Sequence, residues 1–145
     1  MKVQKNMTLE EMVLQKQWKT TVPSTDGSRV ERQIYLLSQK ADKDFSIEDL
    51  RFIILQEIGL SRYIPMAIQK LEDNIFAEGD FYEGDLLSAV LQVSDEYWKS
   101  HNEERVALAR LLANMSESQH SFLDNELPHQ LGRLVNDFLN RYNKN

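Results

Sequence analysis

The amino-acid sequence predicts an all-α protein of about seven or eight short helices. Apolar residues recur at intervals of three and four along most of the 145-residue chain, which is the spacing that lines one face of a helix. Residues that favour helix N-termini stand before several of these apolar stripes. No segment shows the sustained alternation of apolar and polar residues that is typical of a strand. We therefore expect one compact helical domain over residues 1–145.

The first two helices are predicted on either side of a loop. Thr8 and Glu11 form a capping-box pattern, so a short helix is expected from there to Trp18. Residues 20–28 contain turn-forming residues and are expected to form a loop. A second helix is expected along a stripe of Ile34, Leu37 and Ala41.

The third helix has the clearest start and stop signals in the chain. Ser46 is its expected N-cap, since Glu48 and Asp49 follow where the helix dipole favours anions. Gly59 is expected to end the helix in a left-handed conformation, which glycine adopts without steric cost.

Three more helices are expected in the middle of the chain. Ser61 is the expected cap of the fourth, and Pro65 falls near its first turn, where a missing N–H costs little. Residues 74–84 then break the helical period and are expected to form a loop. A fifth helix is expected from Asp85, and a sixth, short one is expected after Ser94.

The final helices are predicted from caps and long apolar stripes. Asn102 is the expected cap of a helix that buries Val106, Ala109, Leu112 and Ala113. The last helix is expected from about Glu126 to Tyr142, with Pro128 in its first turn. Gly132 inside that helix costs about 1 kcal/mol relative to alanine, which favours a close helix crossing there.

The composition excludes thiol chemistry. The chain has no cysteine, so it can hold no disulfide, no cysteine-ligated zinc and no thiol nucleophile, which suits a reducing cytoplasm. The N-terminal residues lack the apolar run of a secretory signal, and no window approaches the roughly 18 apolar residues of a membrane-spanning helix. We therefore expect a cytoplasmic protein that does not bind membranes.

Negative charge is concentrated in one stretch of the chain. The stretch between Lys70 and Lys99 contains eight carboxylates and no Lys or Arg. Because the net charge of the whole chain is −6, the residues outside this stretch carry about +2. Such a local field favours a positively charged partner, and direct nucleic-acid binding is not expected because phosphates need a basic surface. A solvated rim that serves solubility is the alternative interpretation. The eight carboxylates are Glu72, Asp73, Glu78, Asp80, Glu83, Asp85, Asp95 and Glu96.

Aromatic residues lie beside these carboxylates, a composition typical of binding hot spots as well as of packed corners. Adjacent residues in a short loop seldom point the same way, so we expect one ring of the pair Phe81 and Tyr82 in the core and the other near the surface. The candidate partner-binding residues are Glu72, Asp73, Glu78, Asp80, Phe81, Tyr82, Glu83 and Asp85.

The sequence shows no recognisable catalytic or metal-binding motif. The histidines are too far apart to place two ligands on one helical turn, and the carboxylates do not match the spacing of a calcium loop. No nucleophile elbow, phosphate-binding loop or dinucleotide fingerprint occurs. Asp80 and Asp85 could act as an acid–base pair, but no second motif supports that role. We therefore expect no catalytic residue, no metal and no cofactor.

Three segments carry a more specific pattern. They read SIEDLRFIILQEIGL over residues 46–60, IPMAI over 64–68 and AEGDFYEGDLLSAVL over 77–91. Together they resemble the contact-dependent growth inhibition (CDI) immunity proteins of bacteria, and the resemblance covers residues 45–98. The last third of the chain resembles no family that we can name.

The resemblance implies an antitoxin that binds the toxic C-terminal domain of a cognate effector and performs no chemistry. Toxins of this family are often nucleases, whose active surfaces are basic, which agrees with the acidic binder inferred from charge. Two mechanisms stay open: occlusion of the toxin's active site, and docking beside it. The acidic segment is itself part of the family pattern, so it could also be a shared scaffold element.

Other classes of function stay open as well. A small adaptor or regulatory subunit would present the same acidic face to a basic cellular protein. An enzyme with a carboxylate or metal centre would show a melting temperature that depends on metal. The oligomeric state is not predictable from the sequence.

Overall fold

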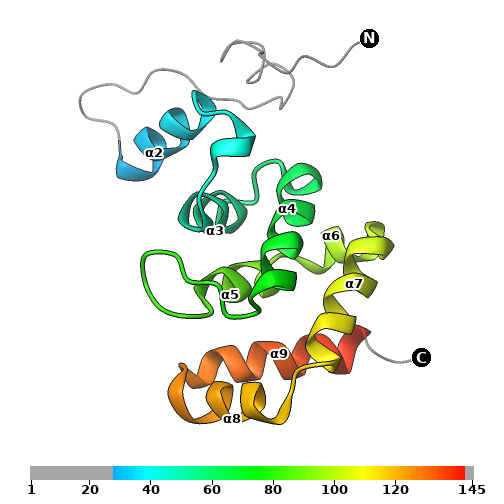
Figure 1. The fold of residues 1–145 in the computed structure, drawn as a ribbon. Helices are drawn as coiled ribbons and strands as arrows, with labels where there is room; N and C mark the ends of the chain where they lie inside the picture. The colour runs from blue at the N-terminus through cyan, green and yellow to red at the C-terminus, as the bar shows by residue number, and fades with distance from the viewer. Residues whose placement is uncertain (1–27, 143–145) are drawn as a thin grey trace.

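The computed structural model describes residues 28–142, and within this range it contains eight α-helices and no β-strand, as expected (Figure 1). The helix expected between Thr8 and Trp18 lies outside the described residues. The elements are α2 (Arg29–Ser38), the 3₁₀ helix η1 (Asp42–Asp44), α3 (Ile47–Leu55), α4 (Leu60–Asp73), α5 (Asp85–Leu91), α6 (Asp95–Ser100), α7 (Asn102–Ala113), α8 (Glu117–Glu126) and α9 (His129–Tyr142).

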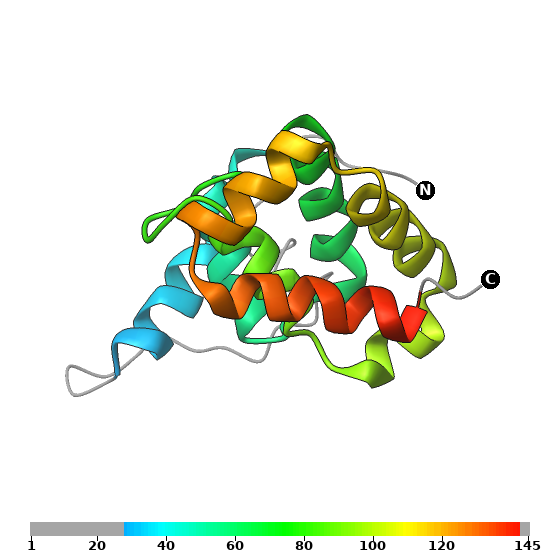
Figure 2. The same cartoon turned by 90° about the horizontal axis from the view of Figure 1, so that it is seen from below.

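The short helix α5 lies at the centre of the fold. All seven of its residues are buried, and it packs against α3, α4 and α9. Helix α7 packs against α4, α6 and α9, and α8 packs against α9 at an angle (Figure 2). The buried apolar side chains form one cluster, in which the ring of Trp98 stands edge-on to Phe138 with 5.2 Å between centroids. These contacts hold the helices at both ends of the loop over residues 74–84.

The cap predicted at Ser46 is confirmed. Its hydroxyl accepts a hydrogen bond from the Asp49 N–H at 3.0 Å, and the Asp49 carboxylate accepts one from the Ser46 N–H at 3.0 Å. Lys40 forms an ion pair with Asp49 at 2.6 Å, which ties the segment after α2 to the start of α3. Equivalent capping boxes begin α2 and α8, formed by Ser28 with Glu31 and by Ser116 with Gln119.

The turn between α3 and α4 differs from the prediction. Helix α3 ends at Leu55, because Glu57, with a φ of 55°, already reverses the chain. Gly59 does adopt the left-handed conformation, with a φ of 61°, but it precedes α4 as its N-cap, so Ser61 lies inside that helix. Pro65 is the sixth residue of α4, beyond the first turn, and α4 therefore lacks the hydrogen bond that an N–H there would donate.

Helix α7 buries a different face from the predicted one. Ala109 and Leu112 are buried as expected, but Val106 is 40% exposed and Ala113 is exposed. Asn102 is the first residue of the helix and not its cap. The buried face is set by packing against α4 and α9, which the spacing within one helix does not reveal.

The C-terminal region contains a helix that the sequence does not predict. Only Leu123 of α8 is buried, so no apolar stripe marks this helix. Helix α9 begins at His129 and not at Glu126, so Pro128 precedes its first residue. A Cβ added at Gly132 would have no neighbour within 4 Å, so the close helix crossing expected there does not occur.

Candidate functional site

The segment over residues 74–84, which we call the acidic loop, is organised around one buried carboxylate. Asp85, the first residue of α5, is 3% exposed. Its carboxylate accepts hydrogen bonds from the N–H groups of Gly79 at 2.6 Å, Phe81 at 2.9 Å and Tyr82 at 3.3 Å. The backbone thus curls around Asp85, which supports the acidic loop from inside.

A second carboxylate holds the tip of the acidic loop from α3. The Glu48 carboxylate accepts a hydrogen bond from the Asp80 N–H at 2.9 Å, and Arg51 donates two more to it at 2.8 and 2.7 Å. Partial burial acts to raise the pKa of Glu48, but the hydrogen bonds from Arg51 and Asp80 and the charge of Arg51 outweigh it and lower the pKa below its ordinary value. Glu48 is therefore held in its charged form.

The base of the acidic loop packs on the C-terminal helices. Phe76 is buried, and its ring lies 5.5 Å from that of Phe122 on α8. Gly84 has a φ of 94°, and its N–H donates to the Phe76 carbonyl at 3.0 Å. A Cβ at Gly84 would lie 2.7 Å from a methyl group of Leu131 on α9, so only glycine fits. The acidic loop is therefore fixed at its base as well as at its tip.

The expected division between Phe81 and Tyr82 is wrong. Phe81 is 66% exposed and Tyr82 is half-buried, so neither ring lies in the core. The reason is the backbone, because the N–H groups of both residues turn toward Asp85 and leave their side chains outside. The ring that the acidic loop contributes to the core is Phe76.

Phe81 has well-defined surroundings despite its exposure. The guanidinium carbon of Arg51 lies 4.4 Å from the centre of the Phe81 ring, within the range of a cation–π contact. A shallow pocket of about 260 Å³ lies beside the ring, between α2, α3 and the acidic loop, and Val30 on its wall is 43% exposed. The site thus combines an exposed aromatic ring with a cation and with flanking carboxylates.

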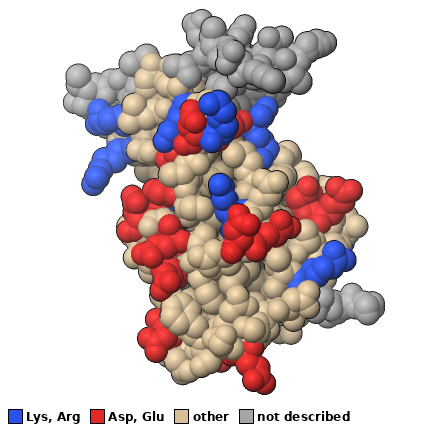
Figure 3. All heavy atoms as spheres, in the orientation of Figure 1, with Lys and Arg blue, Asp and Glu red and all other residues tan. Residues whose placement is uncertain are grey.

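The remaining predicted site residues lie on the surface. Glu72 and Asp73 are exposed at the end of α4, and Glu78, Asp80 and Glu83 are exposed on the acidic loop. Acidic side chains gather across the middle of the face seen in Figure 3, over the acidic loop, the end of α4 and the start of α7, whereas Lys and Arg gather around α2. We call this region the acidic face.

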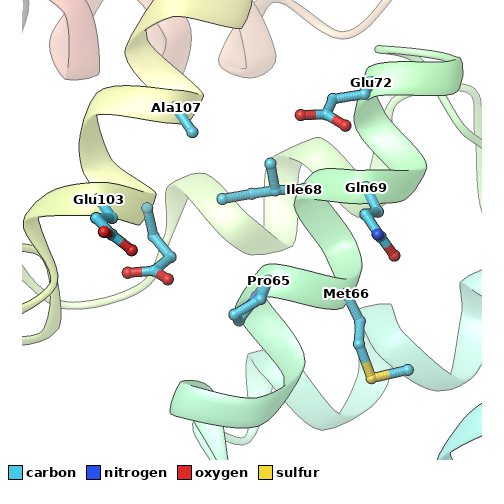
Figure 4. A pocket seen from close by; sticks show the side chains of 8 residues that line it. Pro65, Met66, Ile68, Gln69, Glu72, Glu103 and Ala107 are labelled. Carbon is cyan, nitrogen blue, oxygen red and sulfur yellow. The ribbon is translucent and has the colours of Figure 1, made fainter.

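Sequence reasoning missed a groove between α4 and α7, with a volume of about 470 Å³ (Figure 4). Glu103 and Glu104 line it from the first turn of α7, opposite Glu72 on α4. The sequence indicates these two glutamates as partners of the helix dipole. Nothing in the spacing of the chain places them opposite Glu72, because that requires the packing of α4 on α7.

Comparison with known families adds an independent observation. The sequence model of the CDI immunity proteins matches residues 14–108, which is about two thirds of the chain. The chain belongs to the CDI immunity proteins. Membership implies that this immunity protein neutralises a toxin.

The match confirms the resemblance found over residues 45–98 and places the acidic loop inside the family's pattern. It ends at Leu108 within α7, so α8 and α9 of this immunity protein lie beyond it. No curated protein and no solved structure shows significant similarity to the chain.

Two further properties of the immunity protein concern the described residues alone. No helix within residues 28–142 has the length and hydropathy needed to cross a membrane. In the same range, no three His, Asp or Glu side chains converge as metal ligands would.

The acidic stretch of the sequence ends with two carboxylates on α6, Asp95 and Glu96. Asp95 forms an ion pair with Arg141 at 2.8 Å and thus contributes less free charge than Glu96.

Proposed function

We propose that this immunity protein acts in the cytoplasm by binding the C-terminal toxin domain of a cognate CDI effector, in a stoichiometric complex and without chemistry of its own. The family match over residues 14–108 carries this proposal. Tight binding by a preformed surface is sufficient for inhibition, since an occluded enzyme cannot reach its substrate.

The charge of the immunity protein supports a basic toxin, of the kind that acts on nucleic acid. The carboxylates of Glu72, Asp73, Glu78, Asp80 and Glu83 are exposed, and none of them forms an ion pair within the described residues. Enzymes that bind nucleic acid carry basic active surfaces, because they must neutralise phosphates. An acidic face complements such a surface and speeds its association.

The acidic loop is the contact surface that we propose. Its backbone is clamped by Asp85 and Glu48, so binding requires little further ordering of the loop, and less conformational entropy is lost. Phe81 supplies an exposed ring of the type that dominates interface energies, with carboxylates around it. Tyr82, half-buried beside it, would form part of the rim.

Co-expression with the toxin domain of a cognate CDI effector tests the proposal. Cells that make both proteins are expected to grow, and the two proteins to elute as one stoichiometric complex. Loss of growth without complex formation would contradict it. Recovery of the immunity protein on a basic housekeeping protein, from cells that lack the effector, would favour the adaptor interpretation instead.

A further inference from the structure

The groove between α4 and α7 has an apolar floor formed by side chains from both helices. Pro65 and Ile68 contribute from α4 and Ala107 contributes from α7, whereas Met66 lines the edge of the groove and its side chain points away from α7 (Figure 4). Ile68 is buried and the other three are half-buried, so the floor is open to solvent. Helices that pack on each other define both walls, which gives the groove a fixed width.

Carboxylates stand on both walls of this groove. Glu72 lies on the α4 side, and Glu103 and Glu104 lie on the α7 side. None of the three forms an ion pair or a side-chain hydrogen bond with any residue in the range 28–142. Three carboxylates around the same apolar groove repel one another, and a cation placed between them would relieve that repulsion.

A buried hydroxyl lies near one of these carboxylates. Tyr97 is 7% exposed, and its hydroxyl has no hydrogen-bond partner among the described residues. Burial, and after it the negative charge of Glu104, raises the pKa of Tyr97, so the hydroxyl stays protonated close to that charge. This hydroxyl on α6 makes no hydrogen bond to Glu104, so the negative charge on the α7 wall is left without a donor from the described residues.

We propose that this groove receives an arginine side chain that projects from the toxin domain, as a second contact beside the acidic loop. This inference rests on the proposed function for the identity of the partner. The aliphatic stem of an arginine would cover Pro65 and Ala107, as long basic side chains do on apolar surfaces. Its planar guanidinium has donors pointing in several directions and can reach carboxylates on both walls at once, which a lysine ammonium does less well.

Titration with N-acetyl-L-arginine amide tests the groove without any toxin. The methyl signals of Ile68 and Ala107 in NMR spectra report from the floor, and Met115, which is buried just after α7, serves as an internal reference. We expect shifts at Ile68 and Ala107 that saturate at millimolar concentrations of the arginine compound. N-acetyl-L-citrulline amide, which has nearly the same shape but no charge, is expected to bind about tenfold more weakly or not at all.

Two charge-matched variants make the titration specific. The groove variant Glu72→Gln/Glu103→Gln/Glu104→Gln is expected to lose most of the arginine response. The control variant Asp124→Asn/Glu126→Gln/Asp137→Asn removes the same charge from exposed positions on α8 and α9 and is expected to keep it. Shifts that do not saturate, that are equal with the citrulline compound, or that are equal in the two variants would overturn the proposal.

Binding to the toxin domain then separates this inference from the proposed function. The groove variant is expected to bind the toxin at least about tenfold more weakly than the control variant, mainly through faster dissociation. Equal toxin affinity of the two variants would overturn the proposed second contact even if the groove binds free arginine. If no toxin complex forms with the unmodified protein, the proposed function fails, whereas the arginine titration still decides the chemistry of the groove.

Discussion

Asp85 and Glu83 stand two residues apart in the chain but have opposite surroundings. Asp85 is buried and accepts three backbone hydrogen bonds, whereas Glu83 is exposed and its side chain bonds to no described residue. Replacing Asp85 with alanine would leave three N–H groups of the acidic loop without their acceptor. A backbone donor that loses its partner away from water costs more free energy than the bond contributed.

We therefore expect Asp85→Ala to lower the free energy of unfolding by about 2–4 kcal/mol, because several hydrogen bonds to one charged group are lost together. Urea denaturation measures this change. Glu83→Ala is the matched control and is expected to change it by less than about 0.5 kcal/mol, as at most surface sites. Equal losses in the two variants would show that Asp85 does not hold the acidic loop.

Glu48 gives the fold a predicted dependence on acid. Its pKa in the folded protein lies below the ordinary value of 4.5, so the unfolded chain takes up the proton first as the pH falls. The stabilisation from Glu48 is therefore fully present above about pH 4.5 and is lost as the pH falls through the lower, folded-state pKa. Glu48→Gln is expected to show a shallower loss of stability below pH 4.5 than the unmodified protein.

Thermal unfolding at several pH values between 3 and 6 measures this difference. Glu83→Gln removes an exposed carboxylate of the acidic loop and serves as the control. We expect Glu48→Gln alone to flatten the acid limb of the stability profile. Parallel profiles for all three proteins would mean that the contacts from Arg51 and Asp80 do not hold the carboxylate in its charged form.

At the scale of helices and loops, the two glycines Gly132 and Gly79 make contrasting predictions. Gly132 lies inside α9 with no neighbour within 4 Å of an added Cβ, so Gly132→Ala is expected to stabilise the protein by about 0.5–1 kcal/mol through helix propensity. An added Cβ at Gly79 would lie 2.6 Å from a Glu48 carboxylate oxygen, so Gly79→Ala is expected to destabilise it. Denaturant midpoints that move in the same direction would show that the two glycines do not differ in their surroundings as described.

Local signals account for the elements that the sequence predicts correctly. The cap at Ser46 depends on residues within one turn of each other, so the spacing contains the information. Helix α8 escapes prediction because it buries only Leu123 and has no stripe. Gly59 is recognised as left-handed, but whether such a residue ends one helix or begins the next depends on where the chain must turn.

Tertiary contacts account for the parts of the candidate site that the sequence does not predict. The sequence identifies the acidic segment and its aromatic residues, but it does not distinguish Asp85 from the exposed carboxylates. It also does not bring Glu72 opposite Glu103 and Glu104, which are more than 30 residues away along the chain. Burial of Asp85 and formation of the groove both require helices to be placed against one another.

At the scale of the whole molecule, charge is separated between regions. The acidic face covers the acidic loop, the end of α4 and the start of α7, and basic side chains gather around α2 (Figure 3). Exposed charges interact over about 8 Å at physiological ionic strength, so neighbouring carboxylates act together on an approaching partner. That the whole chain, including the residues before Ser28, forms one domain stays a prediction.

This separation predicts fast, salt-sensitive association with the toxin domain. The association rate is expected to fall steeply between low salt and physiological salt, because screening shortens the range of the acidic face. The dissociation rate is expected to change much less, since contacts already formed are screened less. Stopped-flow mixing at several ionic strengths measures both, and an association rate independent of salt would contradict electrostatic steering.

Charge reversal in the acidic loop tests the central claim, that the acidic face binds the toxin, most directly. The variant Glu78→Lys/Asp80→Lys/Glu83→Lys is to be compared with Asp124→Lys/Glu126→Lys/Asp137→Lys, which changes the net charge equally on α8 and α9. We expect the loop variant to associate with the toxin domain at least about tenfold more slowly and to lose protection of cells, and the control variant to retain both. If the loop variant keeps the association rate, the dissociation rate and the protection of the unmodified protein, the acidic loop is a scaffold and the toxin binds elsewhere.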